Sequence, residues 1–121
     1  MEQRVVVMNA GKMNYDGSMD FSCLSPDTVV YDDTAPEEFL ERVQGAAAIV
    51  TKEMPVPAEL IAQLPDSVRL ICEAGTGYNN IDIGAARARG ITVTNIPAYS
   101  SQRVAHTAIM FLLNLSSSML K

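Results

Sequence analysis

The sequence predicts an α/β domain with a doubly wound, flavodoxin-like sheet of five parallel strands and a long C-terminal helix. Two observations predict this class. Short runs rich in β-branched residues alternate with helical patterns, as in a parallel sheet covered by helices on both faces. Several of these runs are apolar at nearly every position, which is typical of strands buried on both faces. The chain of 121 residues is long enough for one domain with its own core.

Five segments have the composition of strands. They are residues 4–8, 28–31, 46–51, 68–72 and 91–94. A parallel sheet needs a crossover connection between successive strands, and the spacing of these runs leaves room for one after each. We therefore expect four connections, of which the first, residues 11–27, reads as a loop with at most one helical turn.

The second connection contains a helix with recognisable ends. Thr34 is an N-cap candidate, and Pro36 with two following acids suits a first helical turn. The helix stops at Gly45, a usual C-terminal glycine. Its inward side chains are expected to be Phe39, Leu40 and Val43.

The next two connections contain short helices as well. Residues 57–64 form a helix that Pro65 closes, because proline cannot continue a helix. Residues 82–89 form a helix that Asp82 caps and Gly90 ends.

The last segment, residues 101–120, contains no proline or glycine and allows one helix of roughly 30 Å, with Ser101 as its expected cap. Its middle, residues 108–113, is apolar on every side. A helix that is apolar all round is predicted to be buried. We therefore expect that a second surface, besides the sheet, covers this helix.

Composition excludes several classes of function. The formal net charge is −5 and basic residues form no run, so nucleic acid is not expected as a partner. The longest apolar stretch, residues 108–113, falls far short of the roughly 20 residues of a membrane span. The N-terminus lacks the pattern of a signal peptide, and we expect a cytoplasmic protein.

The few cysteines and histidines indicate neither a disulfide framework nor a metal site. Cys23 and Cys72 are too few for such a framework, and Cys72 is expected to be a reduced, strand-buried thiol. His106 is the one histidine, so a zinc site is not expected. Its apolar neighbours favour a packed or capping histidine over a catalytic base.

Ligands of open parallel sheets bind beyond the carboxyl ends of the strands, so the segments after each strand are the candidate sites. After the fourth strand, Gly75 and Gly77 flank Thr76, and such a turn can present free N–H groups to a carboxylate or phosphate. Because short Gly-x-Gly loops are common, the composition of the turn alone favours a plain βα loop with glycines needed only for the turn. It is not the dinucleotide fingerprint, because Asn80 stands at the third glycine position.

Two other strand ends offer polar side chains. Ser100 follows the fifth strand and could face the same crevice as Thr76, since neighbouring strand ends converge. Asp32 and Asp33 end the second strand, but the positions after the first and third strands do not complete a phospho-acceptor pocket. We interpret this acid pair as a solvated loop.

Taken together, residues 75–82, Ala85-Ala86, residues 90–97 and the pattern Val104-Ala105-x-Thr107 resemble the D-2-hydroxyacid dehydrogenases, specifically the hydroxypyruvate reductase and phosphoglycerate dehydrogenase-like members. The resemblance covers nearly the whole chain and is most specific from residue 70 to residue 113. The form Tyr78-Asn79-Asn80 looks like the hydroxypyruvate reductase or lactate dehydrogenase branches.

The resemblance implies a two-domain enzyme that exchanges hydride between NAD(H) and a small 2-keto or 2-hydroxy acid. Residues 1–100 would form its flavodoxin-like substrate domain, and residues 101–121 would form the helix that enters an inserted nucleotide-binding domain. By the same resemblance, Thr76 and Gly77 would bind the substrate carboxylate with their backbone, and Ser100 would lie near the substrate. Thr76, Val104 and Thr107 would lie beside the cofactor.

This sequence also departs from the family pattern. The family's catalytic arginine, glutamate and histidine lie beyond the interdomain helix and have no counterpart here, so no catalytic residue is assigned. The nucleotide fingerprint is absent too, and we expect no cofactor bound to this chain. His106 stands where the family has glutamate or glutamine and does not match the catalytic histidine.

Two hypotheses follow. The first is the N-terminal, substrate-binding portion of such a dehydrogenase, inactive as a truncated chain. The second is a free-standing flavodoxin-like module that binds a small anion or a protein partner. In both, the apolar last helix predicts a homodimer through that helix. The residues are compatible with several 2-hydroxy acids and with either NAD or NADP.

Overall fold

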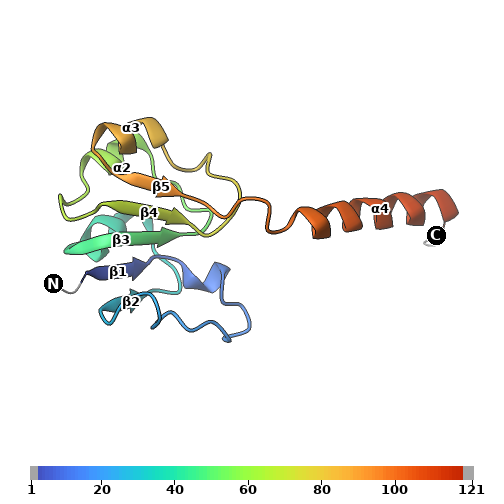
Figure 1. Cartoon of the computed structure of the whole chain (residues 1–121), viewed down its shortest axis with the longest axis horizontal. Helices are drawn as coiled ribbons and strands as arrows, with labels where there is room; N and C mark the ends of the chain where they lie inside the picture. Colours follow the sequence, from blue (N-terminus) through green and yellow to red (C-terminus); the bar gives the residue numbers. More distant parts are fainter. Residues whose placement is uncertain (1–2, 119–121) are drawn as a thin grey trace.

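The computed structural model describes residues 3–118, which contain one sheet of five parallel strands (Figure 1). The strands are β1 (Arg4–Val7), β2 (Thr28–Val30), β3 (Ala46–Thr51), β4 (Leu70–Glu73) and β5 (Thr92–Thr94). They lie in the order β2-β1-β3-β4-β5, which is the order of flavodoxin-like sheets. The predicted fold class is confirmed, and every predicted strand is present within about two residues of its expected ends.

The helices are shorter than the sequence predicts. The helical segments are the 3-10 turns η1 (Ala10–Lys12) and η2 (Pro36–Glu38) and the helices α1 (Phe39–Arg42), α2 (Ala58–Ala62), α3 (Ile83–Ala88) and α4 (Ser101–Ser117). The first connection contains η1 and otherwise forms a loop, as predicted.

The hydrophobic core lies on one face of the sheet. Register places one row of side chains on that face: Val29, Val6, Ile49, Ile71 and Val93. The residues that cover this row come from α1, α2, α3 and their ends: Phe39, Val43, Ile61, Leu64 and Ala86. The inward positions predicted for Phe39 and Val43 are correct, and Leu40 is half-buried against the same cluster.

The opposite face of the sheet differs from the expectation of helices on both sides. Val7 is buried on this face, but the side chains around it are half-buried: Val5, Ala48, Leu70, Val50 and Cys72. The first connection contains a single 3-10 turn, and α4 runs away from the sheet, so residues 3–118 leave this face partly exposed (Figure 1). Cys72 is accordingly a half-buried free thiol rather than a buried one.

Two predicted caps are wrong, and each has a tertiary reason. The N-cap before η2 is Ala35, because the Thr34 hydroxyl is buried and donates a hydrogen bond to the carbonyl of Met8. The Glu38 carboxylate accepts from the Ala35 N–H at 3.0 Å instead. At α4 the N-cap is Ser100, and Ser101 is the first helical residue; Ser100 makes no capping hydrogen bond with its side chain.

Other helix ends follow the prediction. The Asp82 carboxylate accepts from the N–H of Ala85 at 2.9 Å and caps α3. Gly90 and Gly45 have φ of +72° and +73°, the left-handed conformation that glycine adopts without steric cost.

Two exposed aspartates organise the loop before β2. Asp16 accepts hydrogen bonds from the hydroxyl and the N–H of Ser18, at 2.7 and 3.0 Å, and these bonds lower the pKa of Asp16. Hydrogen bonding to Ser22 lowers the pKa of Asp20 in the same way. Both motifs are local turns built from an aspartate and a following serine.

Helix α4 is exposed along its described length, which contradicts the prediction that it is buried. Its 17 residues extend about 25 Å away from the sheet (Figure 1). His106 on its second turn is exposed and neither caps nor packs. The sequence predicts a helix to residue 120, but α4 ends at Ser117, because Ser118 has a left-handed φ of 50°. Residues 119–121 lie outside the described part of the chain.

Candidate functional site

The carboxyl ends of all five strands point toward the side from which α4 leaves the sheet (Figure 1). A cavity of about 350 Å³ lies at this edge, between the segments that follow β3, β4 and β5. Its lining consists of Lys52, Glu53, Glu73, Gly75, Thr76, Gly77, Asn79, Asn80, Tyr99 and Ser100. Its position and size fit the place where open parallel sheets bind small ligands.

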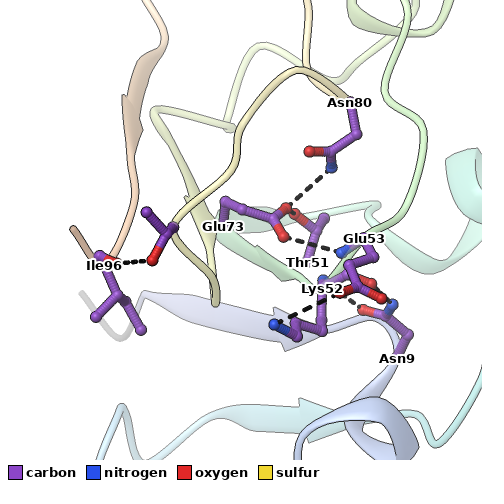
Figure 2. A network of polar contacts seen from close by, with 8 residues as sticks. Asn9, Thr51, Lys52, Glu53, Glu73, Asn80 and Ile96 are labelled. Carbon is purple, nitrogen blue, oxygen red and sulfur yellow. Dashed lines mark hydrogen bonds and ion pairs between the residues drawn. The ribbon is translucent and has the colours of Figure 1, made fainter. Parts of the chain in front are cut away.

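A buried carboxylate is among the groups that line the cavity, and Figure 2 shows its contacts. Glu73, at the end of β4, is 2% exposed. Its Oε2 accepts from the Thr51 hydroxyl at 2.8 Å and from the Asn80 side-chain amide at 3.0 Å. Its Oε1 accepts from the Glu53 N–H at 2.9 Å. One side chain thus links the segments after β3 and β4.

A second polar contact positions the residue after β3. Asn9 is buried at the end of β1, and its side-chain oxygen accepts from the Lys52 N–H at 2.8 Å. The Asn9 amide also donates to the Lys52 carbonyl. Both backbone groups of Lys52 are therefore held by one side chain, and Glu53 follows with a left-handed φ of 54°.

The turn after β4 is tied to the segment after β5. The Thr76 hydroxyl donates to the Ile96 carbonyl at 2.9 Å (Figure 2), and Asn95 donates to the Thr76 carbonyl at 2.8 Å. The Ile96 N–H donates to the Gly75 carbonyl at 2.9 Å. These bonds engage the hydroxyl and carbonyls of the turn and fix its conformation.

The backbone N–H groups of the same turn are unengaged. Within residues 3–118, the N–H groups of Thr76 and Gly77 donate to no protein acceptor. Both residues line the cavity. Neighbouring free N–H groups in a fixed turn form an anion-binding arrangement, so the site is suited to a carboxylate.

Gly75 allows a lysine to approach this turn. A Cβ at Gly75 would lie 3.0 Å from the Lys52 Nζ and 3.5 Å from the Glu73 Oε1. The ammonium of Lys52 therefore occupies the space beside the turn that any larger residue would require. The Lys52 side chain is 18% exposed, and its Nζ lies 3.9 Å from the Glu53 Oε1.

The structure brings together three of the five site residues that the sequence analysis names. Thr76, Gly77 and Ser100 line the same cavity. Val104 and Thr107 lie on the exposed helix α4 and are not among the residues that line it. The Thr107 hydroxyl donates to the carbonyl of Arg103 at 2.9 Å, a contact within the helix.

Sequence reasoning missed the buried network of Asn9, Lys52 and Glu73. A signal was present for Glu73, because it stands two residues after the core residue Ile71 and so points to the same face. A carboxylate at an inward strand position needs partners. Those partners come from β3 and from the loop before α3, which no local pattern identifies.

The described residues provide neither a metal-ion site nor the glycine turn that binds a dinucleotide. Within residues 3–118, no three His, Cys, Asp or Glu side chains are grouped closely enough to hold a metal ion. Asn80 stands at the third glycine position, and its amide is engaged by Glu73 and by the Met54 carbonyl. This turn therefore does not fit a dinucleotide pyrophosphate.

No helix in the described part combines the length and hydropathy for crossing a bilayer.

Comparison with known proteins identifies the family. Residues 5–111 match the family model described as the D-isomer specific 2-hydroxyacid dehydrogenase, catalytic domain. A hydroxypyruvate reductase from Blautia hydrogenotrophica is 32% identical over 117 residues, which are 93% of this chain and 36% of that protein. A glycerate dehydrogenase from Methylorubrum extorquens is 44% identical over 75 residues, covering 61% of this chain and 24% of that protein.

Solved structures show the same fold. A glyoxylate reductase from Paecilomyes thermophila superposes with a TM-score of 0.74 at 26% identity, over 93% of this chain and 37% of that one. A 3-phosphoglycerate dehydrogenase from Entamoeba histolytica, solved with bound NAD+, superposes with a TM-score of 0.72 at 22% identity. The match covers 94% of this chain and 39% of that one. The chain spans well under half the length of each of these proteins. Because the family model matches most of its length, the chain belongs to the D-isomer specific 2-hydroxyacid dehydrogenases.

Proposed function

We propose that the cavity beside the Gly75–Gly77 turn binds the carboxylate of a small 2-keto or 2-hydroxy acid, as the substrate side of an NAD(P)-dependent dehydrogenase. The observation that carries this proposal is the pair of unengaged N–H groups at Thr76 and Gly77, in a turn that is held by bonds to the Thr76 hydroxyl and to the Gly75 and Thr76 carbonyls. Ser100 lines the same cavity and supplies a hydroxyl for the other end of the acid.

In this proposal the chain's residues bind and orient the acid. The nicotinamide cofactor supplies the hydride, while Thr76, with Val104 and Thr107 on α4, is assigned to the cofactor side by family resemblance. Hydride exchange also needs a group that moves a proton to or from the substrate oxygen. Glu73 is engaged by three donors, and His106 is not among the residues that line the cavity. By family resemblance, none of residues 3–118 corresponds to the family's proton-transfer group, and we propose that these residues do not turn over substrate without further groups.

The binding proposal is tested by titrating the ¹⁵N-labelled chain with glycolate, a 2-hydroxy acid that cannot react when no nicotinamide cofactor is present. We expect amide shifts centred on Thr76, Gly77 and Ser100. Glycolamide, which has the same shape without the carboxylate charge, is the matched control and should produce much smaller shifts. Equal shifts with both compounds, or shifts centred elsewhere, would refute carboxylate binding at this turn.

The inactivity proposal has its own assay. Oxidation of NADH and of NADPH by the 121-residue chain with hydroxypyruvate, pyruvate or glyoxylate is expected to be flat. Clear turnover with any of the three acids would show that the proton-transfer group lies within this chain.

We further propose that α4 serves as an interdomain-type helix and, in the isolated chain, pairs with α4 of a second copy. Its exposed apolar side chains support this: Val104, Ile109, Met110, Phe111, Leu112, Leu113 and Leu115. An apolar surface of this kind drives association in water.

The two free cysteines favour a reducing compartment, and we propose the cytosol.

A further inference from the structure

The charges around the cavity are unequal. Among the described residues that line it, Lys52 is the one cationic side chain, whereas Glu53 and Glu73 are carboxylates. A cavity with one ammonium and two carboxylates has a place for a single negative charge. A second negative charge on the ligand would meet Glu53 or Glu73 without a cation of its own.

The fold restricts the position of the Lys52 ammonium. Asn9 holds both backbone groups of Lys52, and the missing side chain of Gly75 leaves room for the ammonium beside the turn. With 18% of its side chain exposed, Lys52 is largely removed from bulk water. A charge held in such surroundings interacts more strongly with a ligand than a surface lysine does.

The ammonium also keeps hydrogen-bonding capacity. Within residues 3–118 its Nζ donates no hydrogen bond to a protein acceptor, and its ion pair with Glu53 is long, at 3.9 Å. The Glu53 side chain is 70% exposed, so this pair is weak. Glu73 has its oxygens engaged by Thr51, Asn80 and the Glu53 N–H, so it does not depend on Lys52 for partners.

We infer that Lys52 is the charge partner of the carboxylate bound at Thr76 and Gly77, and that Glu53 and Glu73 repel a second negative charge. The substrate class is then a monoanionic 2-keto or 2-hydroxy acid whose other end is neutral, such as hydrogen, methyl or hydroxymethyl. Dicarboxylates and phosphorylated acids are disfavoured. This inference rests on the proposed function and adds to it a specificity-determining residue.

Glycerate and tartronate test the charge rule without any mutation, because they differ in one group. Tartronate carries a carboxylate where glycerate has hydroxymethyl. From amide titrations of the wild-type chain we expect glycerate to bind at least about ten-fold more tightly, the ratio that one unfavourable charge contact produces. Equal or tighter binding of tartronate overturns the inference.

Variants at Lys52 test the ammonium itself. Lys52→Met is expected to weaken glycerate binding by about ten-fold or more, since a charge-assisted contact is lost. Lys52→Arg should keep most of the affinity. Lys12→Met, at an exposed lysine on η1, is the matched control and should bind as the wild type does. Unchanged glycerate affinity in Lys52→Met contradicts the inference.

A variant at Glu53 tests the repulsion. Glu53→Gln keeps the shape of the side chain and removes its charge, so it should narrow the preference for glycerate over tartronate by about three-fold or more. An unchanged ratio would remove Glu53 from the rule. If the wild type binds glycerate at Thr76 and Gly77 but Lys52→Met is unaffected, the inference fails and the proposed function stands. If glycerate does not shift those amides at all, the proposed function fails with it.

Discussion

The carboxylate of Glu73 accepts a hydrogen bond from the backbone N–H of Glu53 at 2.9 Å, so a buried charge at the end of β4 fixes the residue after β3. Glu53 has a left-handed φ of 54°, an uncommon conformation for a residue with a side chain. The contact also places Lys52, its neighbour, at the cavity. Glu73 therefore determines the geometry of the site without being available to bind a ligand.

Replacing Glu73 tests this role. Glu73→Gln should lower the free energy of unfolding by about 1–3 kcal/mol, because three donors face Glu73 and an amide cannot accept at all those positions. Glu73→Leu leaves every donor unpaired and should cost more. Urea denaturation measures both. Glu59→Gln, at an exposed position on α2, is the control and should change stability by less than about 0.5 kcal/mol.

Gly75→Ala should affect ligand binding more than stability. The new methyl would lie 3.0 Å from the Lys52 Nζ, the far end of a flexible side chain, so the ammonium moves aside. We expect glycolate affinity to fall by about three-fold or more while the unfolding free energy changes by less than about 1 kcal/mol. Gly84→Ala on α3 is the matched control and should leave affinity unchanged. Wild-type affinity in Gly75→Ala would argue against Lys52 at the ligand.

The cap of α3 has a measurable contribution. Asp82→Ala removes the acceptor of the Ala85 N–H and should destabilise the protein by about 1 kcal/mol. Asp82→Asn retains a side-chain oxygen at the cap and should recover most of that loss. Urea denaturation of the two variants separates them, and equal stabilities would mean that the cap contributes little.

A substitution at Gly90 measures the free-energy cost of a left-handed backbone conformation without any steric contact of the new side chain. Its φ is +72°, and no atom lies within 4 Å of the position that a Cβ would occupy. Gly90→Ala should therefore destabilise the protein by about 1 kcal/mol through the backbone alone. Thermal or urea unfolding measures the change, and a neutral or stabilising result would show that the turn relaxes to another conformation.

Helix α4 predicts association of the isolated chain. Ile109 and Leu113 lie on the same side of the helix, one turn apart, and are 55% and 60% exposed. The double variant Ile109→Glu with Leu113→Glu should raise the dimer dissociation constant by about ten-fold or more, because charges would face an apolar surface. Ser116→Glu on the same helix is the control. Light scattering after size exclusion reports the mass, and a wild-type monomer at high concentration would contradict dimerisation.

Much of the fold could be predicted because its signals are local. The apolar run of residues 46–51 became β3 without a change of boundary, and Asp82 and Gly90 end α3 as their residue types require. The sequence predicts that Ser100 could face the same crevice as Thr76, because parallel strands end at the same edge of a sheet, and both residues line one cavity. These features depend on neighbours along the chain or on topology that the strand pattern implies.

Other features depend on partners that are distant in the sequence. Threonine is a residue type that often caps helices, but the Thr34 hydroxyl donates its hydrogen bond to the Met8 carbonyl. The middle of α4 has the composition of a buried helix, yet nothing within residues 3–118 covers it. Composition states what a segment can bury and does not state which surface buries it.

The α/β class, the strands, the helix ends at Asp82 and Gly90, and the family can all be predicted from the amino-acid sequence. Those properties follow from periodicity, turn chemistry and motif spacing. The tertiary structure alone decided that Glu73 is a buried acceptor for Thr51, Glu53 and Asn80, and that Lys52 stands beside the turn. Both features depend on contacts between the ends of different strands, and these contacts form only when the sheet assembles.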